Sequence, residues 1–239
     1  MKTFNLRHRV KIFIESMTGL RLFRGLPHGI DACYDIARRG LDLQTILDVG
    51  ANTGQSALLF LETFPKAKIH CFEPVTATFA DLQRNLCGTR CRCIHSAVGS
   101  EVGEARISVG RLSSTNSLVN FRPGDATETV RVTTVDAYVD EQALAVVDLL
   151  KVDVEGFDLN VLEGAARSFA SGRVKFVMVE SGFCFSGTQH VAFDVLRAHL
   201  EVLGFSVLGF YHQTPRWSGE NQLQFADVLF AHASTNGKR

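Results

Sequence analysis

From residue 28 onward, short runs of β-branched and aliphatic residues alternate with segments of helical periodicity. This alternation is typical of a parallel sheet whose strands are joined by crossover helices. We expect strands at about 45–49, 67–72, 91–98, 104–109, 128–135, 146–152, 174–180, 205–210 and 223–231. We expect helices at about 30–39, 55–64, 75–86, 157–169 and 188–202, and a long polar loop at 111–125. The sequence therefore predicts an α/β fold with a Rossmann-like, seven-stranded, mostly parallel sheet and a closing antiparallel hairpin.

The size and charge of the chain exclude several classes of protein. Its 239 residues suit one large domain, and 25 Lys and Arg residues balance 25 Asp and Glu residues. A chain without net charge is not an electrostatic clamp for nucleic acid. No apolar run reaches the roughly 18 residues of a membrane-spanning helix, and residues 1–26 lack the clean apolar core of a signal peptide. We therefore expect a soluble, cytoplasmic protein that does not bind nucleic acid.

The six cysteines are expected to be reduced thiols, because a chain of this size builds its own core without disulfides. Cys91, Cys93 and His95 alternate along the expected strand at 91–98. Neighbours on one face of a strand are roughly 6.6–7 Å apart, whereas zinc holds sulfur at about 2.3 Å. We expect no metal there.

The first 26 residues are strongly basic, with six Lys or Arg residues against Glu15 alone. Apolar residues are interleaved with these charges, which is typical of an amphipathic helix. We expect a basic, amphipathic helical extension over residues 1–28 and one domain over residues 29–239. Three roles stay open for the extension: packing on the domain, contact with an anionic membrane or substrate, and a mobile arm.

A glycine-rich turn follows the first expected strand, in the segment ILDVGANTG. Open α/β sheets bind ligands beyond the carboxyl ends of their strands, at turns of this kind. The turn lacks the GxGxxG of dinucleotide sites and the Gly-Lys-Ser/Thr of P-loops. An acidic residue here would repel a diphosphate but suits S-adenosylmethionine, which carries an ammonium and a sulfonium group. We expect the cofactor to contact Asp48, Gly50, Asn52, Thr53 and Gly54.

A second cofactor signal is Glu73-Pro74, at the end of the next expected strand. Glu73 lies 19 residues after Gly54, counted along the chain. That spacing is typical of an acidic residue that accepts hydrogen bonds from ribose hydroxyls. Together with the glycine turn, it predicts a nucleoside-type site.

Acidic residues also end two later strands. Asp153 and Glu155 follow the expected strand at 146–152, before Gly156, and Glu180 ends the strand at 174–180. A single carboxylate at a strand end is often only a helix cap. Three of them at one edge of the sheet, beside a cofactor cleft, predict an active site.

Six segments together resemble the FkbM family of S-adenosylmethionine-dependent methyltransferases: ILDVGANTG, HCFEP, AVGSEVG, TTVDAYV, LLKVDVEGFDLNVLEGA and VMVESGF. The resemblance covers about residues 45–182, and KVDVEG is its specific part. It implies a class I methyltransferase fold, a cofactor site that includes Ser96, Ala97 and Asp153, and O-methylation of a hydroxyl on a sugar, a glycan or a related natural product.

Asp153 is our first choice as the general base that accepts the proton of the attacking hydroxyl. Glu155 and Glu180 would position acceptor hydroxyls, because carboxylates accept hydrogen bonds from hydroxyl donors. Three alternatives stay open for this chemistry. His190 would be the substitute base, the three acids would instead hold Mg²⁺, and Lys151 would pair with one of them.

Two other functions also remain open. One is methylation of a macromolecule, RNA or protein, and the other is a nucleoside-binding module without catalysis. The sequence identifies neither the methyl acceptor nor the oligomeric state.

Overall fold

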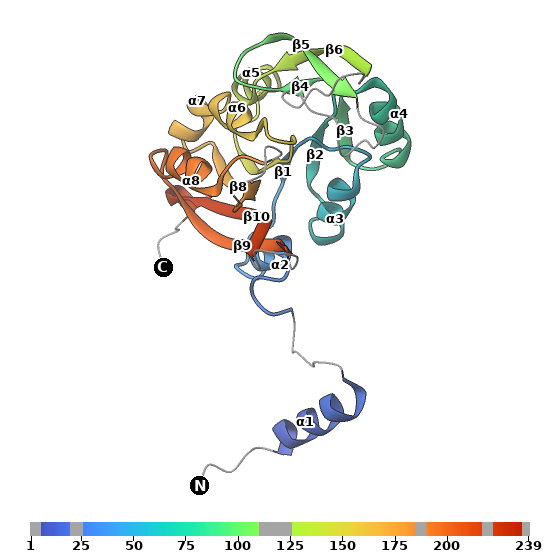
Figure 1. The fold of residues 1–239 in the computed structure, drawn as a ribbon, viewed down its shortest axis with the longest axis vertical. Coiled ribbons are helices and arrows are strands. Elements are labelled where there is room, and N and C mark those ends of the chain that lie inside the picture. Colours follow the sequence, from blue (N-terminus) through green and yellow to red (C-terminus); the bar gives the residue numbers. More distant parts are fainter. Residues whose placement is uncertain (1–5, 20–25, 110–125, 185–189, 217–221, 236–239) are drawn as a thin grey trace.

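A computed structural model describes residues 6–19, 26–109, 126–184, 190–216 and 222–235. Its main sheet has seven strands in the order β3-β2-β1-β7-β8-β10-β9 (Figure 1). Their bounds are β1 Thr45–Val49, β2 Lys68–Phe72, β3 Cys91–Ile94, β7 Val147–Val152, β8 Val174–Gly182, β9 Phe205–Arg216 and β10 Gln222–His232. The first five strands of this order pair in parallel, and β10 is antiparallel to both β8 and β9. The predicted sheet, with its closing antiparallel hairpin, is confirmed.

Helices cover both faces of this sheet, and each face has its own apolar core. The helices are α2 Ala32–Ala37, α3 Gln55–Thr63, α4 Thr76–Asn85, α5 Val135–Glu141, α6 Asp158–Glu163, α7 Ala166–Ala170 and α8 Phe193–Glu201. Side chains of α5 to α8 pack with Leu47 and Val49 of β1 on one face, whereas those of α2 to α4 pack with Ile46 on the other. Alternate residues of β1 face opposite cores because side chains alternate along a strand.

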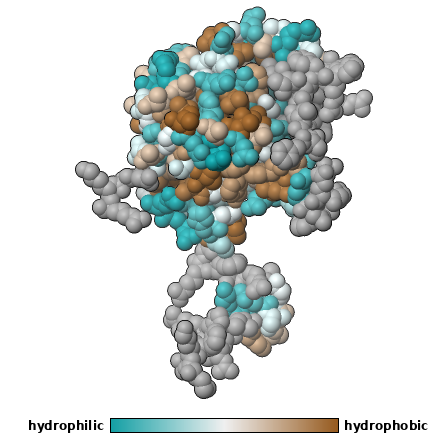
Figure 2. Space-filling view, turned by 60° about the vertical axis from the view of Figure 1, so that its left-hand side comes forward, coloured by the Kyte–Doolittle hydropathy of each residue, from teal (hydrophilic) through white to brown (hydrophobic). Residues whose placement is uncertain are grey.

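Helix α1, Leu6–Thr18, forms within the expected extension but lies apart from the domain (Figures 1 and 2). Its apolar residues Phe13 and Met17 are 63% and 72% exposed. The helix therefore does not pack on the domain in this structure. No helix among the described residues is long and apolar enough to cross a membrane.

The expected strand at 91–98 is wrong, because the chain leaves the main sheet after Ile94. Residues Ala97–Val98 form β4 in a second sheet, of order β4-β6-β5, with β5 at Gly103–Val109 and β6 at Ala126–Thr133. The Ser96 hydroxyl donates to the carbonyl of Arg131 at 3.0 Å, which ties the turn to β6. The expected polar loop at 111–125 lies outside the described residues.

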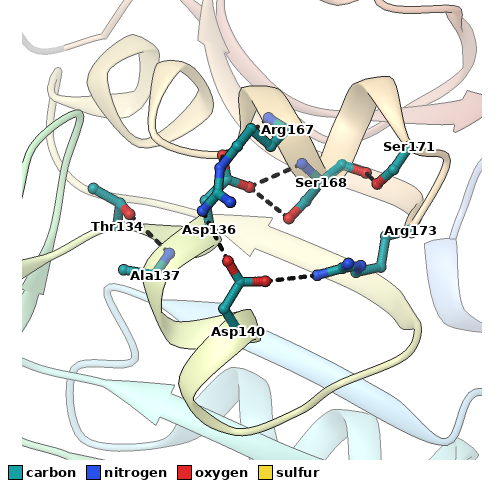
Figure 3. A network of polar contacts seen from close by, with 8 residues as sticks. All are labelled: Thr134, Asp136, Ala137, Asp140, Arg167, Ser168, Ser171 and Arg173. Carbon is teal, nitrogen blue, oxygen red and sulfur yellow. Dashed lines mark hydrogen bonds and ion pairs between the residues drawn. The ribbon is translucent and has the colours of Figure 1, made fainter.

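Helix α5 was not expected from the sequence, and a polar network joins it to α7 (Figure 3). The Thr134 hydroxyl caps α5 by accepting from the Ala137 amide at 3.0 Å. The Asp136 carboxylate accepts from the amides of Arg167 and Ser168, at 2.9 and 2.8 Å, and so caps the start of α7. Asp136 in TTVDAYV therefore has a structural role.

The expected helix at 157–169 is divided into α6 and α7 around Gly164. A Cβ atom at Gly164 would lie 2.0 Å from the carbonyl oxygen of Gly99, so a side chain there would collide with the backbone. Strand β9 also continues to Arg216, beyond the expected end at about residue 210, so His212 and Pro215 lie in a strand.

Candidate active site

The turn after β1 packs directly against the turn after β7. The amide of Asp153 donates to the carbonyl of Val49 at 3.1 Å. Gly50 has a φ of +79°, and a Cβ atom there would lie 1.9 Å from the Asp153 carbonyl oxygen. Only glycine fits this approach, because any side chain would displace the backbone of the neighbouring turn.

A pocket opens beyond the carboxyl ends of β1, β2 and β7, where an α/β sheet binds its ligands. Eight of the residues that we expected at the site line it: Gly50, Asn52, Glu73, Pro74, Ser96, Ala97, Asp153 and Glu155. The other lining residues are apolar and were not expected: Val49, Phe72, Val98, Ile107 and Val154. An apolar residue at a strand end has the same sequence pattern whether it lines a pocket or lies in the core. Ile107 belongs to β5 of the second sheet, so its place in the sequence did not indicate the site.

Two polar groups in this pocket are suited to a ligand with hydrogen-bond donors. The side-chain oxygen of Asn52 is buried and has no hydrogen-bond partner. Glu73 is 6% exposed, and one of its oxygens accepts from the Val75 amide at 3.0 Å. Burial raises the pKa of Glu73 to about 7. A ligand that donates hydrogen bonds would satisfy Asn52 and stabilise the charged form of Glu73.

Three residues that we also expected to contact the cofactor are not among those that line the pocket. Asp48 lies within β1, fully buried. The Thr53 carbonyl accepts from the Asn85 side chain at 2.8 Å. Gly54 begins α3, and a Cβ atom there would lie 3.0 Å from the side chain of Leu86. Thr53 and Gly54 therefore shape the turn, and Asp48 is buried next to Lys151.

Lys151 occupies the space between two carboxylates, as one of our alternatives expected. Its ammonium lies 3.4 Å from Asp48 Oδ1 and 3.1 Å from Asp153 Oδ2, and the residue is 5% exposed. Burial opposes its charge, but the two carboxylates outweigh burial and raise the pKa of Lys151 above its usual range. Lys151 therefore holds Asp153 at the pocket and compensates the charge of Asp48.

The KVDVEG turn brings further acids together. Glu155 has a φ of +53°, an unusual backbone conformation for a residue other than glycine. The Asp158 carboxylate accepts from the amides of Val154 and Gly156, at 3.3 and 3.2 Å, and so fixes the turn. Burial first, and then the charges of Asp153 and Glu180, raise the pKa of Glu155 to about 7. The acids of this rim are thus close enough to interact.

Glu180 holds His190, the substitute base of our sequence analysis. Glu180 follows Val179, which pairs with Val152 in the sheet, so its backbone lies beside that of Asp153. Glu180 Oε2 is 2.9 Å from His190 Nδ1, with both side chains mostly buried. The hydrogen bond to Glu180 raises the pKa of His190 above its usual value. Neither Glu180 nor His190 lines the pocket, but the charge of Glu155 on its rim also raises the pKa of His190.

Residues 48–207 match the family model described as the Methyltransferase FkbM domain. The chain belongs to the FkbM methyltransferase family.

A curated relative, "Methyltransferase 1" of Beauveria bassiana (strain ARSEF 2860), is 30% identical over 166 residues, which cover 56% of this chain and 63% of that protein. The 2-O-methyltransferase NoeI of Sinorhizobium fredii (strain NBRC 101917 / NGR234) is 24% identical over 165 residues, which cover 56% of this chain and 62% of that protein. The chain therefore spans less than two thirds of the length of these relatives.

A solved structure, the 1,6-didemethyltoxoflavin-N1-methyltransferase of Burkholderia thailandensis, is 14% identical. The match has a TM-score of 0.46 and covers 82% of this chain and 74% of that one.

This FkbM domain does not bring Cys91, Cys93 and His95 together as the ligands of one metal ion. His95 follows the end of β3 and stacks on Phe79, with ring centroids 4.5 Å apart. Across the described residues, no three or more His, Cys, Asp or Glu side chains are grouped as a metal ion requires.

Proposed function

We propose that this protein transfers the methyl group of S-adenosylmethionine to a hydroxyl of a sugar, a glycan or a related natural product. The observation that supports this proposal most strongly is the composition of the pocket. It is lined by Asn52, whose side-chain oxygen has no partner, and by the buried carboxylate of Glu73. Asp153 and Glu155 line the same pocket. Membership of the FkbM family supports methyl transfer. The name of NoeI, a 2-O-methyltransferase, supports a hydroxyl acceptor.

The residues of the pocket fit S-adenosylmethionine, which supplies an activated methyl group when it is bound. Glu73 would accept hydrogen bonds from the ribose hydroxyls, as acidic residues at this position of a nucleoside site do. The Asn52 side-chain oxygen would accept from the ammonium group. Phe72, Val98 and Ile107 provide an apolar wall against which the adenine ring would pack.

The acidic rim would bind the acceptor. Asp153 lines the pocket while Lys151 holds one of its oxygens, so we assign it to cofactor and acceptor positioning. Glu155 would accept a hydrogen bond from a neighbouring hydroxyl of the acceptor. These side chains would hold the attacking oxygen in line and exclude water from it.

We assign the general base to His190, with Glu180 as its positioning residue. The hydrogen bond at 2.9 Å fixes the ring and stabilises the imidazolium that forms when the hydroxyl loses its proton. An imidazole titrates near neutral pH, where a general base works best. Asp153, our first choice from the sequence, stays the alternative base, because it lines the pocket.

A methyl-transfer assay with radiolabelled S-adenosylmethionine tests this function on a panel of sugars, glycans and hydroxylated natural products, with RNA and protein as competing acceptors. We expect turnover on the first group only. Transfer to RNA or protein alone would refute the acceptor class, and cofactor binding without transfer to any acceptor would refute catalysis. Loss of turnover with a chelator, restored by Mg²⁺, would assign the acids to a metal instead.

Two variants test the base once an acceptor is found. His190→Gln should lower kcat by about 10²–10⁴-fold and leave cofactor affinity intact. Asp153→Asn keeps the size of the side chain and should raise the acceptor KM more than it lowers kcat. The reverse pattern would return the role of the base to Asp153.

A further inference from the structure

Helix α1 presents an apolar face that no described part of the chain covers. Val10, Phe13, Ile14 and Met17 are spaced i, i+3, i+4 and i+7, so they lie on one side of the helix. Their exposed fractions are 48%, 63%, 39% and 72%. Figure 2 shows tan and brown atoms along the lower edge of the part that lies below the domain, next to teal and white ones. A helix that exposes four large apolar side chains together is suited to docking.

The charge of the chain is unevenly distributed around this helix. Residues 1–26 contain six Lys or Arg residues and one Glu, a net charge of +5, in a chain whose total net charge is zero. The remaining residues therefore carry a net charge of −5. Within the helix, the Lys11 ammonium lies 3.6 Å from Glu15, the single acidic residue of the segment. The positive charge is thus concentrated in the same segment of the sequence as the exposed apolar face.

We propose that α1 docks the protein on an anionic phospholipid membrane. The apolar face would enter the boundary between headgroups and acyl chains, while Lys and Arg side chains contact the lipid phosphates. The helix has 13 residues. At 1.5 Å per residue it is about 20 Å long, shorter than the roughly 30 Å of a bilayer core, so it lies on the membrane and does not span it.

Charge favours a membrane over a second copy of the chain as the occupant of this face. Two copies would bring two segments of net charge +5 together, and like charges would oppose that contact. An anionic bilayer offers opposite charge and an apolar layer at once, which matches both properties of the helix.

Co-sedimentation of the full chain with vesicles tests the proposal. We expect binding to phosphatidylserine mixed with phosphatidylcholine, weak binding to phosphatidylcholine alone, and weaker binding as salt increases. The double variant Phe13→Glu/Met17→Glu should lose at least about tenfold in vesicle affinity. Arg7→Gln/Arg9→Gln should lose about fivefold per residue, because each basic residue near an anionic surface is worth about 1 kcal/mol.

The matched control places the same two charges on the domain, at Val102→Glu/Val202→Glu, where the residues are 69% and 83% exposed. This control should bind vesicles like the parent protein. Absence of vesicle binding by the parent, equal binding by Phe13→Glu/Met17→Glu, or a lipid-free dimer that depends on Phe13 would each overturn the proposal. S-adenosylhomocysteine binding, measured in every variant by calorimetry, keeps this test separate from that of the proposed function.

Discussion

Replacing Lys151 by methionine should destabilise the protein strongly, because the substitution leaves Asp48 buried without a counter-charge. Asp48 is 0% exposed, and neither of its side-chain oxygens has a hydrogen-bond partner. Without the ammonium at 3.4 Å, the carboxyl would fold in its neutral form. Protonating a carboxyl with an ordinary pKa of about 3.9 costs about 4.2 kcal/mol at pH 7, at 1.36 kcal/mol per pH unit. We therefore expect a loss of about 4 kcal/mol at pH 7.

The pH dependence of this loss gives a sharper test. Burial already raises the pKa of Asp48, and removal of Lys151 should raise it further. The folded variant then binds a proton that the unfolded chain releases near pH 4, so its stability falls as pH rises. The penalty should shrink by about 1.4 kcal/mol per pH unit on acidification, to about 1.5 kcal/mol at pH 5.

Urea unfolding of Lys151→Met at pH 5, 6 and 7, followed by circular dichroism, measures both effects. The double variant Asp48→Asn/Lys151→Met should recover most of the stability, because it removes the buried charge. Lys68→Met, at an exposed position of β2, is the control and should change stability by less than about 0.5 kcal/mol. Three results would refute the reasoning: a loss of stability below about 1 kcal/mol at pH 7 in Lys151→Met, a loss that does not change with pH, or no recovery of stability in the double variant.

Two further predictions concern the turn and the base. Gly50→Ala should destabilise the protein by more than about 2 kcal/mol in urea unfolding, because its Cβ atom would overlap the Asp153 carbonyl at a φ of +79°; unchanged stability would show that the two turns separate at little cost. Glu180→Gln should move the acidic limb of the kcat/KM profile to lower pH, because the carboxylate raises the pKa of His190; an unmoved limb would separate Glu180 from the base.

The elements that sequence reasoning predicts well are those with continuous local signals. Strands β1 and β7 are apolar runs that end in polar turns, and both have the predicted positions to within a residue. After the break at Ile94, Ala97 pairs with Val132 of β6, 35 residues away, and a local sequence pattern cannot contain a pairing at that distance. Helix α5 had a local signal that we missed, because Thr134 is a favourable N-cap residue.

The residues of the candidate site likewise include some that local sequence patterns predict and some that they do not. Glu73 and Asp153 could be predicted because a strand end determines where its next residue lies. Asp48 was misplaced because it lies one residue inside the strand, where its side chain faces Lys151 and not the pocket. The sequence signal for His190 was weaker than that for Glu180. His190 contacts Glu180 only because the chain folds back after β8, and no local pattern indicates this.

Calorimetric titration with S-adenosylhomocysteine, the demethylated product of the cofactor, tests most directly whether this pocket binds S-adenosylmethionine. We predict binding for which neither NAD nor ATP competes at similar concentration. Glu73→Gln should weaken this binding by about 1.5–3 kcal/mol, roughly 10- to 150-fold, because charged hydrogen bonds to the ribose are lost. Binding of NAD without binding of S-adenosylhomocysteine, or unchanged affinity in Glu73→Gln, would contradict this prediction.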